Sequence, residues 1–533
     1  MDLATGSGTG QRASGPEDWF LTAAQRGNRA TVLDDRHPHG DAWSHGNLVR
    51  PLIHGASYFA ELARSVEQAQ PGDLLMFADW RGDPDERLTG SAASEVGKVL
   101  GRAAARGVQV RGLVWRSHWD DLGFSARENR KLDEEVNQAG GCCQLDMRVR
   151  LGGSHHQKFV VLRHPGRPDL DVAFIGGIDL CHGRRDDSAH GGDPQRLPMA
   201  RVYGDRPPWH DIQLAVSGPA VSDVETVFRE RWENRQALSR SPIRLIADWR
   251  RGDDRRPGPL PALPPPPPAG PHSVQVLRTY PRRAGGYPFA PQGERSVARG
   301  YMKALSRARG LIYLEDQYLW SRDVGSVIAA ALRAQPGLHL IAVLPHYPDQ
   351  DGQVSLAPNL IGRRAALSLI HAAAPGRVAV YGAENHAGTP VYVHAKVCVI
   401  DDEWASVGSD NFNRRSWTHD SELSIAVWDA TPTAGGAGRY PRDLRLALAA
   451  EHLDDDLANA TEPTAVFRRF ARSAAALQAW HDGGCRGPRP PGRLRPLDEV
   501  PLPSLTRLWA EPLYRTIYDP DGRPRGWRRR GRY

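Results

Sequence analysis

Apolar stretches of strand length alternate along the chain with longer segments whose apolar residues recur at helical spacing. In the first half, residues 58–64 show the helical spacing, and in residues 73–77 Asp73 is followed by four apolar residues. Residues 96–114 then combine an amphipathic helix, a glycine turn and another apolar strand. Strands that alternate with helices predict a layered α/β fold rather than a β-sandwich or a helical bundle.

The same order of elements returns in the second half of the chain. Residues 301–307 and 310–314 repeat the first helix and strand, and residues 325–344 repeat the helix, turn and strand that follow. Apolar strands at 159–162 and 397–400 are also equivalent, and each follows a His-x-Lys tripeptide. Repeated landmarks in one order indicate a tandem duplication. We therefore expect two tandem α/β/α sandwich domains, packed as a pseudo-twofold dimer within one chain.

A proline-rich run at residues 257–271 separates the two repeats. Proline cannot donate a backbone hydrogen bond, so this run suits an extended, semi-rigid connector. An SH3-type ligand is the alternative, but the position between the repeats already explains the composition. The expected organisation is an N-terminal extension (1–50), a first domain (51–250), a linker (251–272), a second domain (273–455) and a C-terminal extension (456–533).

Charge and composition add little about the partner. The formal net charge of +7 is modestly basic, and an arginine-rich composition explains it as well as an adaptation to polyanions does. Basic residues gather at 527–532, where a disordered tail is favoured over a contact with anionic lipid. Residues 1–17 contain no apolar core of a signal peptide, and no stretch approaches the length of a membrane span. The five scattered cysteines suit a reducing compartment. We expect a cytoplasmic protein that is peripheral to the membrane at most.

Two His-x-Lys tripeptides are the most informative chemistry in the sequence. They are His156-Gln157-Lys158 and His394-Ala395-Lys396, and together they use two of only five lysines. Residues two apart on a strand face the same way, so each histidine and its lysine point into one pocket. If the halves pack about a pseudo-twofold axis, both pairs converge on a single shared site.

Two ammonium groups beside two imidazoles suit a phosphodiester. The lysines neutralise the non-bridging oxygens, one histidine attacks phosphorus, and the other protonates the departing oxygen, through a covalent phosphohistidine. Asp211 and Glu422 occupy equivalent places after the two tripeptides and are the candidates for orienting the histidines. This chemistry requires neither a metal nor a cofactor, and none is expected.

These residues resemble the signature of the phospholipase D superfamily, which is His-x-Lys, four residues and Asp, followed by Gly-Gly or Gly-Ser, Asn and Arg-Ser. The second copy matches this signature at His394, Lys396, Asp401, Gly408, Ser409, Asn411, Arg415, Ser416 and Glu422. The first copy resembles the eukaryotic-type branch at 155–158, 176–180, Arg184 and 209–211, as does the segment 312–318.

The resemblance implies roles for individual residues. His156 would be the nucleophile, and His394 the general acid that later activates water. Asn411 is a candidate donor to the phosphoryl oxygens, whereas Asp179, its counterpart in the first half, cannot donate when ionised and would order the loop. For both Asp179 and Asn411 the alternative is a turn residue that bonds its own backbone.

The first copy departs from the signature at Arg163, which stands where the aspartate is expected. Counting back from the glycines instead aligns Asp169 with Asp401, so the loop carries an insertion. Gly177 and Ser409 are equivalent in the same alignment and are the supporting backbone positions beside the phosphoryl group. We expect the aspartate to brace the fold more than to touch phosphorus, so activity should survive the change.

Three functions follow from the resemblance. The first is a phospholipase D that cuts the distal phosphodiester of a glycerophospholipid at a membrane surface, giving phosphatidic acid and a free head group, or exchanging the head group with a lipid alcohol. The second is a phosphatidyltransferase of the cardiolipin-synthase kind, disfavoured because such enzymes usually carry N-terminal membrane spans. The third is a nuclease or nucleic-acid binder, favoured only by the basic balance. Since both half-sites lie in one chain, we expect a monomer.

Five tryptophans lie near the ends of predicted strands and are candidates for lining an acyl-chain entrance, although core packing is the favoured interpretation. They are Trp80, Trp115, Trp119, Trp320 and Trp404.

Overall fold

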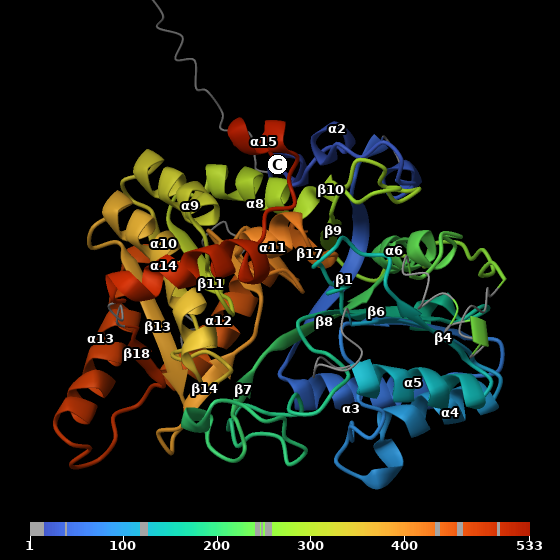
Figure 1. The fold of residues 1–533 in the computed structure, drawn as a ribbon, viewed down its shortest axis with the longest axis horizontal. Coiled ribbons are helices and arrows are strands. Elements are labelled where there is room, and N and C mark those ends of the chain that lie inside the picture. Colours follow the sequence, from blue (N-terminus) through green and yellow to red (C-terminus); the bar gives the residue numbers. More distant parts are fainter. Residues whose placement is uncertain are drawn as a thin grey trace, which may run out of the picture.

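The computed structural model describes residues 15–37, 40–117, 126–239, 246, 249–250, 258–431, 438–455, 462–497 and 502–533. Helices and strands alternate as predicted in both halves (Figure 1). The first half contains β1 (Ser44–Ile53), α3 (Gly55–Glu67), β2 (Leu74–Asp79), α4 (Val96–Ala105), β3 (Gln109–Trp115), α5 (Ala126–Gln138), β4 (Cys142–Asp146), β5 (Phe159–Arg163), β6 (Val172–Gly176), β7 (Trp209–His210), β8 (Ile212–Ser217) and α6 (Ala220–Trp232). The second half contains β9 (His272–Tyr280), β10 (Glu294–Arg295), α8 (Ser296–Arg307), β11 (Leu311–Glu315), α9 (Arg322–Ala334), β12 (His339–Val343), α10 (Gln353–Ala373), β13 (Val378–Glu384), β14 (Pro390–Val393), β15 (Val397–Ile400), β16 (Trp404–Gly408), α11 (Arg414–Thr418), β17 (Glu422–Asp429) and α12 (Arg439–Leu453).

The strands of the two halves join into one ladder. Its order is β4-β3-β2-β5-β6-β8-β1-β9-β17-β16-β15-β11-β12-β13, and β18 (Leu494–Pro496) pairs with the outer edge of β13. Equivalent strands stand at equal distances from the centre, where β1 runs antiparallel to β9 with Ser44 opposite Val274. The duplication read from the sequence is therefore also a symmetry of the sheet.

Helices cover both faces of each half of this sheet (Figure 1). Helices α3, α4 and α5 close an apolar cluster on one face of the first half, and α8, α9 and α10 close another on the second half. A third cluster joins the opposite faces: Phe228 of α6 and Leu444 of α12 pack with strand residues of both halves, such as Phe159 and Val397. The predicted fold, two α/β/α sandwich domains packed together, is confirmed.

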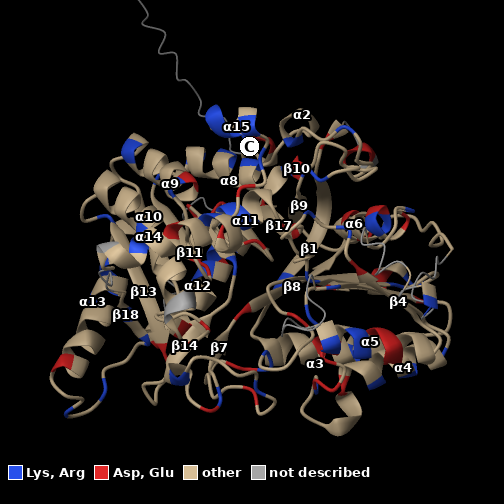
Figure 2. Ribbon diagram, in the orientation of Figure 1, with Lys and Arg blue, Asp and Glu red and all other residues tan. Residues whose placement is uncertain are grey.

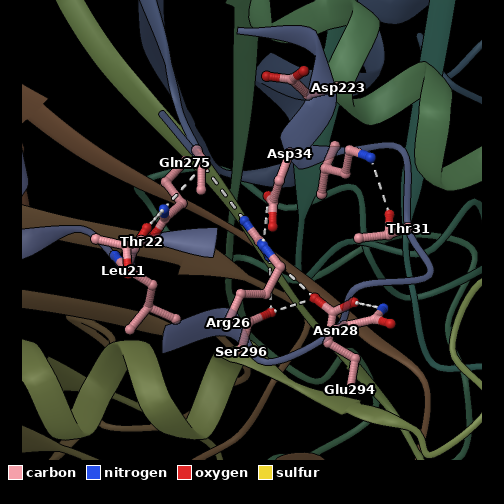
Figure 3. Close-up of polar contacts among 12 residues, drawn as sticks. Leu21, Thr22, Arg26, Asn28, Thr31, Asp34, Asp223, Gln275, Glu294 and Ser296 are labelled. Atoms are coloured by element: carbon pink, nitrogen blue, oxygen red, sulfur yellow. Dashed lines mark hydrogen bonds and ion pairs between the residues drawn. The ribbon is translucent and has the colours of Figure 1, made fainter. Parts of the chain in front are cut away.

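The N-terminal segment is fixed to the second half by a buried polar cluster (Figure 3). Arg26, at the end of α2 (Ala23–Arg26), donates to Asp34 at 2.7 Å, and to Glu294 and Ser296 at 3.1 Å each. These partners lie on two separate segments, and the guanidinium is fully buried. A buried charge of this kind persists only when it is paired, so the cluster holds the N-terminal segment in place.

The linker and the C-terminal segment also dock onto the folded halves. Leu260 of the proline-rich run is buried in the shared core, and its carbonyl accepts a hydrogen bond from Arg229 at 3.0 Å. Helices α13 (Pro463–Asp482), α14 (Ser504–Leu513) and α15 (Arg525–Arg529) follow the second half. Figure 2 shows α15 as a basic helix at the C-terminal end. The prediction of a disordered tail is wrong, because Tyr533 is buried and its carbonyl accepts from Arg299 at 3.0 Å.

Among the described residues, no helix has the length and apolar character needed to cross a membrane.

Candidate functional site

Each His-x-Lys tripeptide begins at a backbone contact with the opposite half. The amide of His156 donates to the carbonyl of Ser421 at 2.9 Å, and Ser421 directly precedes β17. In the second copy, β14 pairs in parallel with β7, and the amide of His394 donates to the carbonyl of His210 at 2.8 Å. The two predicted half-sites therefore meet at the interface between the halves.

The carboxylates are crossed between the two halves. His156 Nδ1 lies 2.9 Å from Glu422 Oε2, and His394 Nδ1 lies 2.7 Å from Asp211 Oδ2. An ionised carboxylate only accepts, so each ring donates through Nδ1 and keeps Nε2 for a substrate. The carboxylate of one half thus orients the histidine of the other, which links the two tripeptides as one unit.

The two lysines lie deep in the same site. Lys158 Nζ is 3.4 Å from Asp179 Oδ1 and 5.7 Å from the centre of the Trp80 ring. Lys396 Nζ is 3.4 Å from Gln317 Oε1 and also donates to the carbonyl of its own histidine. Burial lowers the pKa of Lys396 to about 8, and the nearby Lys158 ammonium acts in the same direction. The two ammonium groups are close enough to influence each other.

The protonation of the second half-site follows from its burial. Burial, then the Lys396 ammonium, lowers the pKa of His394 to about 3, although Asp211 opposes the shift. Burial alone would raise the pKa of Asp211, but contact with His394 and Lys396 lowers it below its ordinary value. At neutral pH the pair is a neutral imidazole that donates to a carboxylate, and Nε2 of His394 carries a free lone pair.

Asp179 and Asn411, the two equivalent turn residues, are both buried in the site. Burial and the neighbouring Asp179 raise the pKa of Asp79 well above its ordinary value. Burial would also raise the pKa of Asp179, but Lys158 and the hydrogen bond with Asp79 lower it. Asp79 therefore keeps its proton while Asp179 is the anion that faces Lys158. Oδ1 of Asn411 has no hydrogen-bond partner among the described residues.

Asp401 and Asp169 do not share an environment. Asp401 accepts from the amides of three successive residues, 309–311, at 2.7 to 2.9 Å, so it braces the turn before β11. Asp169 is exposed on a short 3-10 turn. Asp171, two residues on, is the buried acid of this loop: it lies 2.7 Å from Arg163 Nε and accepts from the amide of His164 at 2.6 Å. The arginine at position 163 is thus accommodated by an ion pair with Asp171, which does not involve His156 or His394.

The equivalent positions Gly177 and Ser409 differ in what they give the carboxylates. Ser409 Oγ donates to Glu422 Oε2 at 2.6 Å, and the amide of Leu423 donates to Ser409 Oγ at 3.1 Å. A Cβ on Gly177 would lie 2.3 Å from Asp211 Oδ1, closer than real Cβ contacts come. The absence of a side chain there is therefore a steric requirement of the Asp211–His394 pair.

Arg184 is a site residue to which the sequence assigned no chemical role. Its Cζ lies 3.8 Å from the centre of the Trp209 ring, and that ring lies 4.8 Å from the His394 ring. Its Nε is buried and has no hydrogen-bond partner among the described residues. Arg415, its counterpart, is instead held by Asp420 at 2.7 Å. The duplicated motif predicted an arginine at both positions. It did not predict that, among the described residues, Arg415 would have a carboxylate partner and Arg184 would not.

The tryptophans divide between the site and the core. Trp80 stacks on Trp115 at 5.6 Å and meets the His156 ring edge-on at 6.2 Å. Trp320 and Trp404 are buried in apolar clusters, as the core interpretation predicts. Trp119 lies outside the described residues.

Both halves match known family models. Residues 84–253 match the model described as phospholipase D, and residues 302–435 match the model described as cardiolipin synthase, PLD-like domain. Together the two matches cover more than half of the 533 residues.

Curated relatives agree along most of the chain. Phospholipase D alpha 1 of Cynara cardunculus is 26% identical over 499 residues, which cover 70% of this chain and 60% of the relative. Phospholipase D1 of Saccharomyces cerevisiae is 24% identical over 521 residues, covering 80% of this chain and 30% of the relative. The chain thus spans less than two thirds of either relative. Among solved structures, phosphatidylserine synthase of Haemophilus influenzae aligns with a TM-score of 0.47 at 14% identity, covering 80% of this chain and 93% of that one.

Proposed function

The chain belongs to the phospholipase D superfamily, and we propose that it is a phosphodiesterase that hydrolyses the distal phosphodiester of glycerophospholipids to phosphatidic acid and a free head group. The observation that carries this proposal is the crossed pairing of two histidines with two carboxylates, beside two buried lysines. The proposed setting is a membrane surface, where the lipid substrate resides.

The geometry supports a two-step displacement. In the first step Nε2 of His156 attacks phosphorus, a nitrogen–phosphorus bond forms, and the bond to the head-group oxygen breaks. His394 gives that oxygen a proton. In the second step His394 takes a proton from water, the resulting oxygen attacks phosphorus, and the bond to His156 breaks. Lys158 and Lys396 stabilise the charge on the non-bridging oxygens throughout.

The general acid acquires its proton together with the substrate. His394 is neutral in the substrate-free protein, because burial and the Lys396 ammonium lower its pKa. An anionic phosphodiester offsets the Lys396 charge and so favours the protonated ring. Glu422 on His156 and Asp211 on His394 keep both Nε2 atoms directed at the substrate.

A phosphatidyltransferase is the second candidate. It is favoured by the match of residues 302–435 to the model described as cardiolipin synthase, PLD-like domain. The first step is unchanged in this scheme, and a lipid alcohol replaces water in the second. The partition between the two outcomes depends on which acceptor reaches the phosphohistidine.

A substrate panel tests the proposal. Phosphatidylcholine, phosphatidylethanolamine, phosphatidylglycerol and single-stranded DNA are incubated with the full chain and with His156→Ala, and phosphatidic acid, exchanged lipid and cleaved DNA are measured. We expect phosphatidic acid from the phospholipids, none of it from the variant. Exchange product without phosphatidic acid would favour the transferase, and cleavage of DNA alone would replace the lipid assignment with a nuclease.

A further inference from the structure

A cluster of buried histidines lies next to the candidate site, where its member His210 accepts a hydrogen bond from the amide of His394. It consists of His54 after β1, His190 in the loop before β7, His210 on β7 and Glu451 on α12. One ligand atom from each of the four residues lies within 4.8 Å of the others. The segments that supply them come from both halves, so the cluster spans the same interface as the candidate site.

Three ring nitrogens converge on one carboxylate. Nε2 of His54 lies 2.8 Å from Glu451 Oε2, Nε2 of His190 lies 3.0 Å from Oε1, and Nδ1 of His210 lies 3.3 Å from Oε1. Ligand atoms that share one small ion at bond lengths of about 2.0–2.2 Å and near-tetrahedral angles are about 3.3 Å apart. The three observed separations, 2.8, 3.0 and 3.3 Å, are at or slightly below this spacing.

The ring separations agree with the same centre. The ring centroids are 4.8 Å apart for His54 and His190, 4.9 Å for His54 and His210, and 5.6 Å for His190 and His210. Two imidazoles on one tetrahedral ion, bonded at about 2.0–2.1 Å, have centroids roughly 5 Å apart. All three pairs are close to this value.

Two of the three histidines also have the outer contacts typical of metal ligands. Nε2 of His210 is 2.7 Å from Glu315 Oε2, and Nδ1 of His190 is 3.2 Å from the carbonyl of Trp209. A ligating histidine usually donates its far N–H to a carboxylate or carbonyl, which fixes the ring and its tautomer. Glu315 is itself held by His452 at 2.8 Å, so this outer shell is ordered.

We propose that His54, His190, His210 and Glu451 bind one divalent transition-metal ion. Three imidazoles and one carboxylate are a donor set that zinc accepts, and four protein ligands leave no open position, so the site is structural. The carbonyl of His210 accepts the amide of His394, and Asp211 is the next residue. The ion therefore holds the strand that positions the second half-site, without touching the phosphoryl group.

Without an ion, Glu451 would accept hydrogen bonds from the ring N–H groups of His54 and His190. Nδ1 of His210, which has no hydrogen-bond partner among the described residues, would lie unbonded 3.3 Å from the same carboxylate. The metal content of the purified protein distinguishes the metal-bound state from the metal-free hydrogen-bonded state.

Elemental analysis of the full chain, purified without chelator or added metal, is the test. We expect about one zinc or similar ion per chain in the wild type, and a loss of at least half of it in His54→Ala and in Glu451→Gln. His386→Gln is the matched control, because His386 is a half-exposed histidine that pairs with Asp454 at 2.9 Å outside the cluster. It should keep the ion.

A second measurement, on the wild type, tests the proposal even if the variants fail to fold. The wild type is stripped with a strong chelator, and thermal unfolding is followed before and after adding zinc or cobalt. We expect a lower Tm without metal, recovery with one equivalent, and the visible absorption of a tetrahedral cobalt site. Wild-type protein that contains no stoichiometric metal and gains no stability from zinc or cobalt would overturn the proposal in favour of the metal-free hydrogen-bonded state, whatever the outcome of the lipid assays.

Discussion

The two lysines occupy equivalent places in the duplicated halves, yet their surroundings differ. The strand register places Ala78 opposite Phe159 and Glu315 opposite Val397, which makes Trp80 and Gln317 equivalent. Lys158 therefore has an aromatic ring and the Asp179 carboxylate, whereas Lys396 has a neutral amide and, among the described residues, no carboxylate within ion-pair distance. One scaffold thus holds one ammonium with a direct carboxylate partner and one that has none among the described residues, and the second has no such ion pair to break when an anionic substrate binds.

The largest effects should come from the histidines, and they test whether the halves act as one unit. His156→Ala should lower kcat/KM on phosphatidylcholine by roughly 10⁴-fold or more, and His394→Ala by about 10²–10⁴-fold. Because both histidines act on one phosphorus, the double variant should be little less active than the less active of the two single variants. Near-complete activity in either single variant would show that the two half-sites do not act as one unit.

The crossed carboxylates give the next largest effect. Glu422→Gln should lose about 10²-fold or more, because the His156 ring loses the partner that fixes its tautomer. Asp211→Asn should do the same to His394. Each carboxylate variant should reproduce the phenotype of the alanine variant at the histidine that it contacts in the opposite half.

An activated substrate reveals that crossing. A p-nitrophenyl phosphodiester needs no protonated leaving group, so the first step should be largely rescued in His394→Ala and Asp211→Asn but not in His156→Ala or Glu422→Gln. The phosphoenzyme should then accumulate on His156, which alkaline quench and peptide mass spectrometry would locate. An adduct on His394 would reverse the two roles while keeping the two steps.

A comparison of Arg184 with the exposed Arg201 separates a local binding role from an effect of overall charge. Arg184→Gln should raise KM and lower kcat/KM by about 10- to 100-fold, the value of a charge-assisted hydrogen bond to an anion. Its guanidinium stacks on Trp209 and has no carboxylate partner among the described residues. The thermal stability should change little. Arg201→Gln removes the same charge from an exposed side chain and should leave kcat/KM within about twofold. Equal effects of the two would mean that only overall charge matters.

The smallest predicted effect concerns the lysine environments directly. Asn411→Asp places a carboxylate where the first half has Asp179, and so should raise the pKa of Lys396 above its value of about 8. Lys396 loses its charge as pH rises through that pKa, so the basic limb of the pH–rate profile should move to higher pH. At neutral pH the loss should stay below about tenfold. An unmoved basic limb would show that Lys396 does not govern it.

The duplication made much of this site predictable. His156, Lys158 and their copies were marked by a repeated spacing on strands, and repeated position alone selected Asp211 and Glu422. Repetition could not show the crossing, because that depends on how the halves pack. It also placed Asp169 opposite Asp401, although the inserted loop uses Asp171 instead.

Features without a repeat were not predictable in the same way. His54, His190 and Glu451 come from a strand end, a loop and a helix, with no common spacing to join them. The docking of the basic C-terminus depends on the burial of Tyr533 and on its hydrogen bond with Arg299, which composition does not reveal. Tertiary packing decided both.

The central β1–β9 pair has a consequence for how the two half-sites became unlike. Two separate copies of one repeat could join through the same antiparallel pair as a symmetric homodimer, whose interface is isologous. Every substitution in such an assembly appears twice, so the position held by Asp179 and Asn411 would be Asp in both copies or Asn in both copies. Covalent fusion removes that constraint while the continuous ladder keeps the copies aligned. The fused chain can therefore hold Asp at 179 and Asn at 411, so that its two halves have different functions in the site.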